Sequence, residues 1–187
     1  MIHTIAHLLG IKLEGSECSA EIEKKVVEQL EKVPYIQYPT AFHTVDIIAT
    51  RQGESGFELL LGRKHKSTEW VFIGGFVEPK QTAESAALRE LHEKTNILIE
   101  NESRLVYLGS HFIDDARYKD SCHKISTSLF TIQLTDEEAA QAKGGDDISE
   151  TKWLKLGEIE VNLKEHHRVL LYKFLISTSK WHHSHNL

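Results

Sequence analysis

Cysteine is scarce in this chain, since Cys18 and Cys122 are the only two in 187 residues. Two cysteines cannot build the disulfide framework of a small secreted domain, and such scarcity is typical of a protein that stays in a reducing compartment. Long apolar runs are also missing, because no uninterrupted stretch approaches the roughly 18 residues that cross a bilayer. The first residues lack the basic segment of a signal peptide, and His3 and His7 interrupt their apolar pattern. We therefore expect a cytoplasmic protein without a membrane partner.

An excess of basic residues is absent as well. The chain has 22 Lys and Arg against 28 Asp and Glu, which gives a net charge of −6. No basic stripe stands out, and this argues against a nucleic-acid partner. Hydrophobic residues make up 40% of the chain and charged residues 27%, the proportions of an ordinary soluble globular protein. The length predicts one domain with an appendage.

What the chain does have is a stretch, residues 71–97, in which an apolar segment, a glycine turn and a helix follow one another. Gly74 and Gly75 end the apolar segment, at a place where the backbone must turn or approach a ligand closely. Thr82 is expected to cap the beginning of the helix, and Asn96 to end it in the left-handed conformation. The stretch therefore predicts a strand, a loop and a capped helix.

The polar side of that helix carries the charged groups that suggest chemistry. Glu90 and Glu93 are three residues apart, so both carboxylates lie on one face. Lys94 follows Glu90 by four residues and shares its face, and Arg89 precedes Glu93 by four. Two acids and two bases are thus predicted to lie together beside the glycine turn.

This stretch resembles the Nudix box, G-x5-E-x7-R-E-U-x-E-E-x-G-U, in which U is an aliphatic residue. Aligned on the second glycine, six of the nine defined positions match, namely Gly75, Arg89, Glu90, Leu91, Glu93 and Ile97. The three departures are Gln81 for the first Glu, Lys94 for the last Glu and Asn96 for the Gly. The resemblance implies an α/β fold, the Nudix α/β/α sandwich with a mixed β-sheet between helices.

With this fold, the chain is expected to divide into three parts. Residues 1–39 form an N-terminal helical extension and linker, residues 40–165 the Nudix domain, and residues 166–187 a C-terminal helix and His-rich tail. The extension contains two stripes of apolar residues at helical spacing, within residues 1–10 and 19–33. These stripes need a partner surface, which is either the chain's own domain or a second copy in a homodimer.

The resemblance also implies which residues hold a metal. Glu90, Glu93 and a backbone carbonyl at Gly74 would bind Mg²⁺ or Mn²⁺ against the diphosphate of a nucleoside diphosphate linked to another moiety, such as ADP-ribose, because hard ions prefer oxygen ligands. The metal activates a water that cleaves the phosphoanhydride. Arg89, Glu90 and Glu93 are then catalytic, and an acid from the loop that begins with Gly-Gly-Asp-Asp at residues 144–147 assists them, with Glu150 or Asp147 as the candidate.

Four residues are implied in substrate binding, namely Gly75, Lys94, Arg63 and Arg117. Arg63 belongs to a basic segment, residues 63–66, that either offers positive charge to a phosphate or is simply solvated. Arg117 follows an expected strand, in a loop that either contacts the substrate together with Tyr118 or is a surface turn. Both alternatives stay open.

The departures from the box leave two functions open. Lys94 replaces the family's usual main metal ligand by an ammonium, which repels a metal ion, and Gln81 removes a charge that Arg89 would have met. These changes favour a nucleotide-binding protein whose hydrolase activity is weak or lost and whose site needs no metal. The rest of the box favours an active Mg²⁺-dependent hydrolase that uses Glu90, Glu93 and a loop acid.

The remaining sequence predicts ordinary structural elements. Strands are expected at residues 42–50, 57–61, 105–113 and 124–134, and a helix at residues 165–178. That helix is expected to pack through Val169, Tyr172, Phe174 and Ile176. His166 and His167 stand at its start, and His182, His183 and His185 follow it. The histidines lack the spacing of zinc ligands and a scaffold that would fix them in place. This favours a disordered tail over a zinc site.

Overall fold

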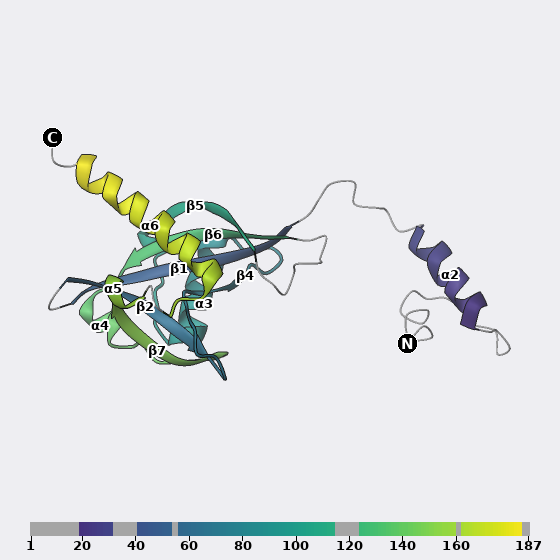
Figure 1. Ribbon diagram of the computed structural model, residues 1–187, viewed down its shortest axis with the longest axis horizontal. Coiled ribbons are helices and arrows are strands. Elements are labelled where there is room, and N and C mark those ends of the chain that lie inside the picture. Colours follow the sequence, from purple (N-terminus) through teal and green to yellow (C-terminus); the bar gives the residue numbers. More distant parts are fainter. Residues whose placement is uncertain (1–18, 32–40, 54–55, 115–123, 160–161, 185–187) are drawn as a thin grey trace. The chain divides into compact units, whose positions relative to one another are not determined.

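The structure is a computed structural model that describes residues 19–31, 41–53, 56–114, 124–159 and 162–184 (Figure 1). By its contacts the chain divides into two units, Met1–Pro39 and Thr40–Leu187. In the first unit, helix α2 (Ser19–Glu31) is amphipathic and buries Ile22 and Val26. The helix expected within residues 1–10 lies outside the described residues. None of the described helices is both long and apolar enough to cross a membrane.

The second unit contains the sheet and the helices that cover it. In chain order its elements are β1 (Ala41–Gly53), β2 (Gly56–Lys64), β3 (Trp70–Val71), β4 (Ile73–Phe76), α3 (Ala83–Thr95), the 3-10 turn η1 (Glu102–Arg104), β5 (Val106–Ile113), β6 (Lys124–Gln133), α4 (Asp136–Ala139), β7 (Ile148–Lys155), α5 (Leu156–Ile159) and α6 (Glu165–Ser184). The strands expected at 42–50, 57–61, 105–113 and 124–134 are confirmed as β1, β2, β5 and β6.

The seven strands form one mixed sheet. Five of them follow the order β3-β2-β1-β6-β5, while β4 also pairs with β1 and β7 with β2. Strands β1 and β6 run parallel, whereas the other pairs are antiparallel. Strand β1 is the centre of this arrangement, because it pairs with β2, β4 and β6 at once.

Two separate cores lie on the two faces of the sheet. On one face Val45 and Ile47 of β1 pack with Leu91 of α3, and on the other face Ile48 packs with residues of α6. Successive residues of a strand point to opposite faces, which is why neighbours in β1 belong to different cores. Helices therefore cover both faces, and the expected α/β/α sandwich is confirmed (Figure 1).

The helix of the sequence motif has the predicted ends. Thr82 caps α3, and its side chain accepts a hydrogen bond from the Ser85 backbone N–H at 3.1 Å. Asn96 ends the helix with φ of 59°, in the left-handed region that asparagine tolerates. Both predictions are confirmed, and these ends fix where the helix's charged residues lie along the sheet.

The packing expected for the last helix is wrong in part. Phe174 is buried, but Val169, Tyr172 and Ile176 are about half exposed, at 47%, 55% and 52%. The helix instead packs on the sheet through Leu170, Leu171 and Phe174. The apolar residues of this helix form two stripes, and the sequence pattern does not distinguish the covered stripe from the exposed one. Helix α6 also continues to Ser184, so that His182 and His183 belong to it rather than to a tail.

The corrected packing predicts different costs for two adjacent substitutions. Leu170 is fully buried, so Leu170→Ala should lower the free energy of unfolding by about 2–5 kcal/mol. Val169→Ala removes a half-exposed side chain and should change it by no more than about 0.5 kcal/mol. Urea unfolding of both variants measures the difference. Equal costs at the two positions would contradict this docking of α6.

Candidate functional site

A cleft of about 520 Å³ opens beside the glycine turn of β4. Its walls come from β1, β4, α3, the loop before β7 and the beginning of α6. This volume lies within the roughly 300–1,000 Å³ that small-molecule sites usually have. The predicted site residues that line it are Gly74, Gly75, Arg89, Glu90, Glu93, Lys94 and Asp147. The fold thus brings most of the sequence motif into one cavity.

The two glycines are required by close packing around the cleft. Gly74 and Gly75 pair with Asp46 and Val45 of β1. A Cβ atom on Gly75 would lie 2.4 Å from the carboxylate of Glu90, and one on Gly74 would lie 2.1 Å from the carbonyl oxygen of Val45. Real Cβ atoms do not approach so closely, so any other residue at these positions would displace the strand or the acid.

Arg89 connects the helix to the glycine strand. Its Nη1 donates to Oε2 of Glu93 at 2.7 Å, and its Nη2 donates to the carbonyl oxygen of Phe76 at 2.9 Å. The same Nη2 lies 2.9 Å from Oε1 of Glu90, whose side chain is only 8% exposed. Arg89 is therefore paired with both predicted acids, Glu90 and Glu93. Its bond to the Phe76 carbonyl also attaches α3 to β4.

Lys94 lies at the centre of a second set of ion pairs. Its Nζ is 2.7 Å from Oδ1 of Asp147, 3.3 Å from Oδ2 of Asp146 and 3.6 Å from Oε2 of Glu90. The side chain of Lys94 is 9% exposed. Asp147 also accepts a hydrogen bond from Nζ of Lys64 through its other oxygen, at 2.5 Å. An ammonium from the helix is thus enclosed by three carboxylates from two different segments.

The protonation states follow from this arrangement. Burial by itself lowers the pKa of Lys94, but its hydrogen bond to Asp147 and the charges of Asp147 and Glu90 outweigh burial and raise the pKa above its ordinary value. Burial by itself raises the pKa of Asp147, whereas its bonds with Lys64 and Lys94 lower the pKa below the usual value of an aspartate. At neutral pH Lys94 is therefore a cation and Asp147 an anion.

Backbone hydrogen bonds attach the loop before β7 to the end of α3. The N–H of Gly145 donates to the carbonyl of Lys94 at 3.0 Å, and the N–H of Lys143 donates to that of Thr95 at 3.0 Å. The side chain of Asn96 donates to the Lys143 carbonyl at 2.9 Å. The first two bonds satisfy carbonyl groups in the last turn of α3, which have no hydrogen-bond partner within the helix. They also fix Asp146 and Asp147 next to Lys94.

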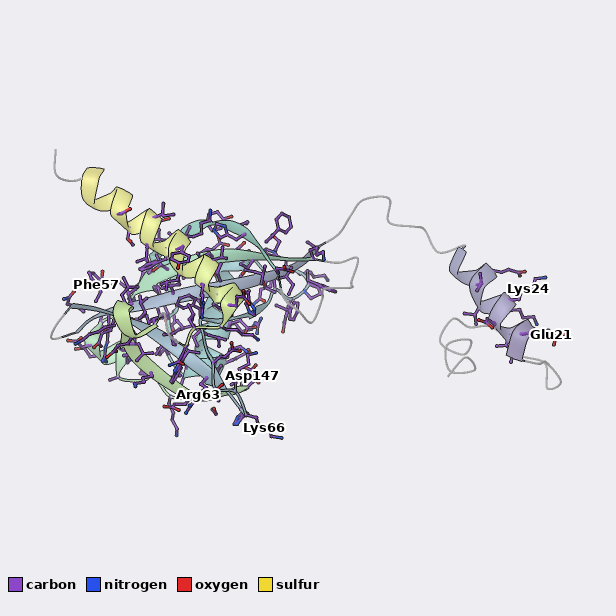
Figure 2. The ribbon with its side chains drawn as sticks, in the orientation of Figure 1. Glu21, Lys24, Phe57, Arg63, Lys66 and Asp147 are labelled. Atoms are coloured by element: carbon purple, nitrogen blue, oxygen red, sulfur yellow. The ribbon has the colours of Figure 1, made fainter. Side chains whose placement is uncertain are left out.

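Other predicted residues lie elsewhere. Arg63 and Glu150 form an ion pair with each other, and Arg63 also stacks on Trp70 with its Cζ 5.2 Å from the ring centre. Neither of the pair is among the residues that line the cleft, although Figure 2 shows Arg63 at the same end of the domain as Asp147. Arg117 and Tyr118 lie outside the described residues.

Sequence reasoning missed an acid on the floor of the cleft. Asp46 of β1 is 8% exposed, and its Oδ2 accepts a hydrogen bond from the hydroxyl of Thr127 at 2.6 Å. Burial, reinforced by the charge of Glu90, outweighs that bond and raises the pKa of Asp46 to about 7. The signal was a single aspartate beside the apolar run Val45, Ile47, Ile48 and Ala49 of the strand expected at residues 42–50.

Asp46 has an uncharged neighbour that the sequence analysis also missed. Nδ1 of His167, at the start of α6, lies 3.8 Å from Oδ1 of Asp46. The same nitrogen accepts a hydrogen bond from the Phe72 backbone N–H at 3.2 Å, so it carries no proton in this arrangement. Asp46 and His167 therefore form a weakly charged floor, in contrast to the ion pairs around Lys94.

The donor set does not fit a resident divalent ion. Among the described residues, no group of three or more His, Cys, Asp or Glu side chains is arranged to hold a metal. The carboxylates that a metal would use are paired with cations of the chain, since Glu90 lies between Arg89 and Lys94, and Glu93 pairs with Arg89. The position expected of the strongest ligand is held by the Lys94 ammonium itself.

Comparison with known proteins gives consistent results. The NUDIX domain model matches residues 40–174. An ADP-ribose pyrophosphatase from Methanocaldococcus jannaschii is 27% identical over 165 residues, which cover 87% of this chain and 88% of that protein.

Two solved structures show the same fold. The NUDIX domain of Shewanella oneidensis NrtR, crystallised with ADP ribose, matches with a TM-score of 0.59 and 19% identity over 81% of this chain and 97% of that one. A mutT/nudix family protein from Listeria innocua matches with a TM-score of 0.60 and 24% identity over 76% and 97% of the two chains.

The buried carboxyl of Asp46 predicts a pH-dependent stability. Its pKa is about 7 in the folded protein and near 3.8 when unfolded, so the folded state binds more protons between these values. Its contribution is therefore most favourable below about pH 4 and is lost as the pH rises through about 7. Asp46→Asn removes this ionisable group. The change that it makes in the free energy of unfolding, variant minus original protein, should be more positive at pH 8 than at pH 4 by up to about 4 kcal/mol.

Urea unfolding at both pH values measures this difference. Asp114→Asn makes the same change at an exposed aspartate and is the matched control. If the effect of Asp46→Asn differs no more between the two pH values than that of the control, Asp46 is not the buried acid described above.

Proposed function

This chain belongs to the NUDIX domain family, and from that premise we propose that it binds a nucleoside diphosphate linked to another moiety, such as ADP-ribose, with weak or lost metal-dependent hydrolase activity. The nucleotide class is supported by the curated relative named as an ADP-ribose pyrophosphatase and by the fold neighbour crystallised with ADP ribose. The loss of activity is supported by one observation, the Lys94 ammonium enclosed by Glu90, Asp146 and Asp147.

Electrostatic repulsion by Lys94 weakens metal binding. Two unit charges about 4 Å apart interact by ~4 kcal/mol at an effective dielectric of 20, and the interaction between a divalent ion and an ammonium is about twice as large and repulsive. A metal at the carboxylates of Glu90 and Asp147 would therefore have to displace Lys94 from 2.7–3.6 Å contacts. Lys94 would then remain in the protein interior without its partners, which is itself costly.

We assign the roles of the site residues on the same basis. Arg89, Lys64 and Lys94 are the cations of the cleft that a diphosphate would contact, and Gly75 leaves room for the carboxylate of Glu90 beside them. Glu90 and Glu93, with the carbonyl of Gly74, are the donors that a hydrolase would use for its metal. All these groups line one cleft.

The loop acid of the site is better assigned to Asp147 than to Glu150. Asp147 lines the cleft and contacts Lys94, whereas Glu150 pairs with Arg63 outside the cleft lining. Arg63, bound to Glu150 and stacked on Trp70, then serves to hold β2 and β7 together beside the site.

The alternative is an active Mg²⁺- or Mn²⁺-dependent hydrolase that uses Glu90, Glu93 and Asp147. The 27% identity to a protein named for that activity favours it. In that case Lys94 would turn away when the metal enters and would contact the substrate. The two functions make opposite predictions for replacement of Lys94 by an acid.

The first prediction concerns the ligand without any metal. ADP-ribose or a related compound should raise the melting temperature in the presence of a chelator, because the cations of the cleft are part of the chain. At 100 times its dissociation constant a ligand stabilises the folded protein by ~2.7 kcal/mol. Differential scanning fluorimetry against a panel of nucleoside diphosphate compounds makes the measurement. No shift with any member of the panel, with or without Mg²⁺, would contradict the proposed function.

The second prediction concerns the box. Lys94→Glu restores the ligand, and Gln81→Glu adds an acid near Arg89, whose Nη2 is 3.5 Å from the oxygen of Gln81. The double variant should bind Mg²⁺ or Mn²⁺ more tightly than the original protein and hydrolyse ADP-ribose faster, by metal titration and by product-release kinetics.

Lys66→Glu makes the same change of charge as Lys94→Glu, but at an exposed turn (Figure 2), and should alter neither metal binding nor hydrolysis. If the original protein is a fast Mg²⁺-dependent hydrolase and Lys94→Glu slows it, the alternative function is correct and Lys94 acts on the substrate.

A further inference from the structure

Two exposed phenylalanines meet at the edge of the cleft. Phe76, at the end of β4, lines the cleft and is 44% exposed, and Phe42, at the start of β1, is 38% exposed. Their ring centres are 6.0 Å apart and the planes make an angle of 85°, an edge-to-face contact. Neither ring belongs to one of the two cores of the domain. Phe76 therefore presents an exposed aromatic ring to the cleft, which a flat ligand can contact.

The backbone holds both rings in fixed positions. Thr44 pairs with Phe76 in the antiparallel ladder of β1 and β4, and the N–H of Val77 donates to the carbonyl of His43 at 3.0 Å. The side chain of His43 is in turn hydrogen-bonded to Ser128 of β6 at 3.0 Å. A ring carried by a paired strand loses little freedom when a ligand stacks on it, which favours binding.

The pair is also connected to the charged part of the cleft. Phe76 directly follows Gly75, which faces the carboxylate of Glu90. The carbonyl of Phe76 accepts the hydrogen bond from Nη2 of Arg89. An anionic group at Arg89 and a flat apolar group on Phe76 would therefore occupy neighbouring parts of one cavity, which is the arrangement of phosphate and base in a nucleotide.

We propose that Phe76, supported edge-on by Phe42, is the stacking platform for the nucleobase of the bound nucleotide. This inference rests on the proposed function and extends it, because it assigns the direction in which the ligand lies. The diphosphate lies toward Arg89, Lys64 and Lys94, and the base lies toward the ends of β1 and β4. An aromatic face stacks on any base, so the platform supplies affinity for nucleotides in general rather than a choice among them.

The test compares a nucleotide with a probe that has no base. Calorimetry with ADP-ribose and with inorganic pyrophosphate gives the affinity of each variant for the whole ligand and for its charged part. Phe76→Ala should weaken ADP-ribose binding by about 5- to 150-fold, as expected for the loss of one stacked base, and leave pyrophosphate binding unchanged. Phe42→Ala should weaken ADP-ribose binding less, because it removes only the support.

Two further variants separate stacking from folding. Phe76→Leu keeps an apolar side chain and should lose ADP-ribose affinity nearly as Phe76→Ala does, whereas Phe76→Trp should retain it. The fluorescence of Phe76→Trp, compared with that of the original protein, should be quenched by ADP-ribose and not by pyrophosphate. Phe57→Ala is the matched control, since Phe57 is 55% exposed at the other end of the domain (Figure 2).

The outcomes are distinguishable. If the original protein binds ADP-ribose and Phe76→Ala and Phe76→Leu bind it equally well, the platform is wrong while the proposed function stands. Equal weakening of ADP-ribose and pyrophosphate would also overturn the platform, because the effect would then come from the strand and not from the base. If the original protein binds neither the nucleotide panel nor pyrophosphate, the proposed function fails and the platform fails with it.

Discussion

The ammonium of Lys94 lies where three carboxylates converge, and the arrangement of the cleft depends on this contact. It joins the end of α3 to the loop before β7, and Asp147 extends the connection to Lys64 of β2. Without a cation at this point, Glu90, Asp146 and Asp147 would repel one another across a partly buried space. In a metal-dependent site a divalent ion removes that repulsion. Here a side chain of the protein does so.

Replacing a bound ion by a tethered ammonium changes what the cleft can do. A lysine has one positive charge and cannot activate a water by coordination, so it stabilises an anion without supplying the nucleophile of a hydrolysis reaction. The weakly charged surfaces nearby, with Asp46 and His167 on the floor and Phe76 at the edge, are suited to the less polar parts of a ligand. The cleft therefore places cations of the chain beside weakly charged and aromatic surfaces.

Much of the fold was predictable because local rules agree with the tertiary structure. Thr82 and Asn96 cap α3 as their side chains predict, and most apolar residues of β1 and β6 are buried, namely Val45, Ile47, Ile48, Ile125, Leu129 and Ile132. Helix α6 was predicted less well, since Val169 and Leu170 are adjacent and equally apolar, and only the docking on the sheet decides which of them is covered.

The site was predictable only in part. The motif identified the residues of α3 and the glycines, but it carried no information on which distant groups meet them. Glu150 and Asp147 were equal candidates for the loop acid, but Glu150 lies in β7 opposite Arg63, whereas Asp147 lies before β7 and lines the cleft. Asp46 is brought to the cleft by pairing of β1 with β4, a contact between strands that no local pattern specifies.

The most direct test of the central claim is to count the divalent ions that the unmodified protein binds. Mn²⁺ is suitable because free and bound ions give different electron paramagnetic resonance signals. If Lys94 takes the place of the metal, titration at neutral pH should show no tight site in the cleft, and Mn²⁺ at millimolar concentration should remain almost entirely free. The opposite result would be one Mn²⁺ bound per chain with micromolar affinity and released by an excess of chelator without unfolding. That result would contradict the claim that Lys94 takes the place of the metal.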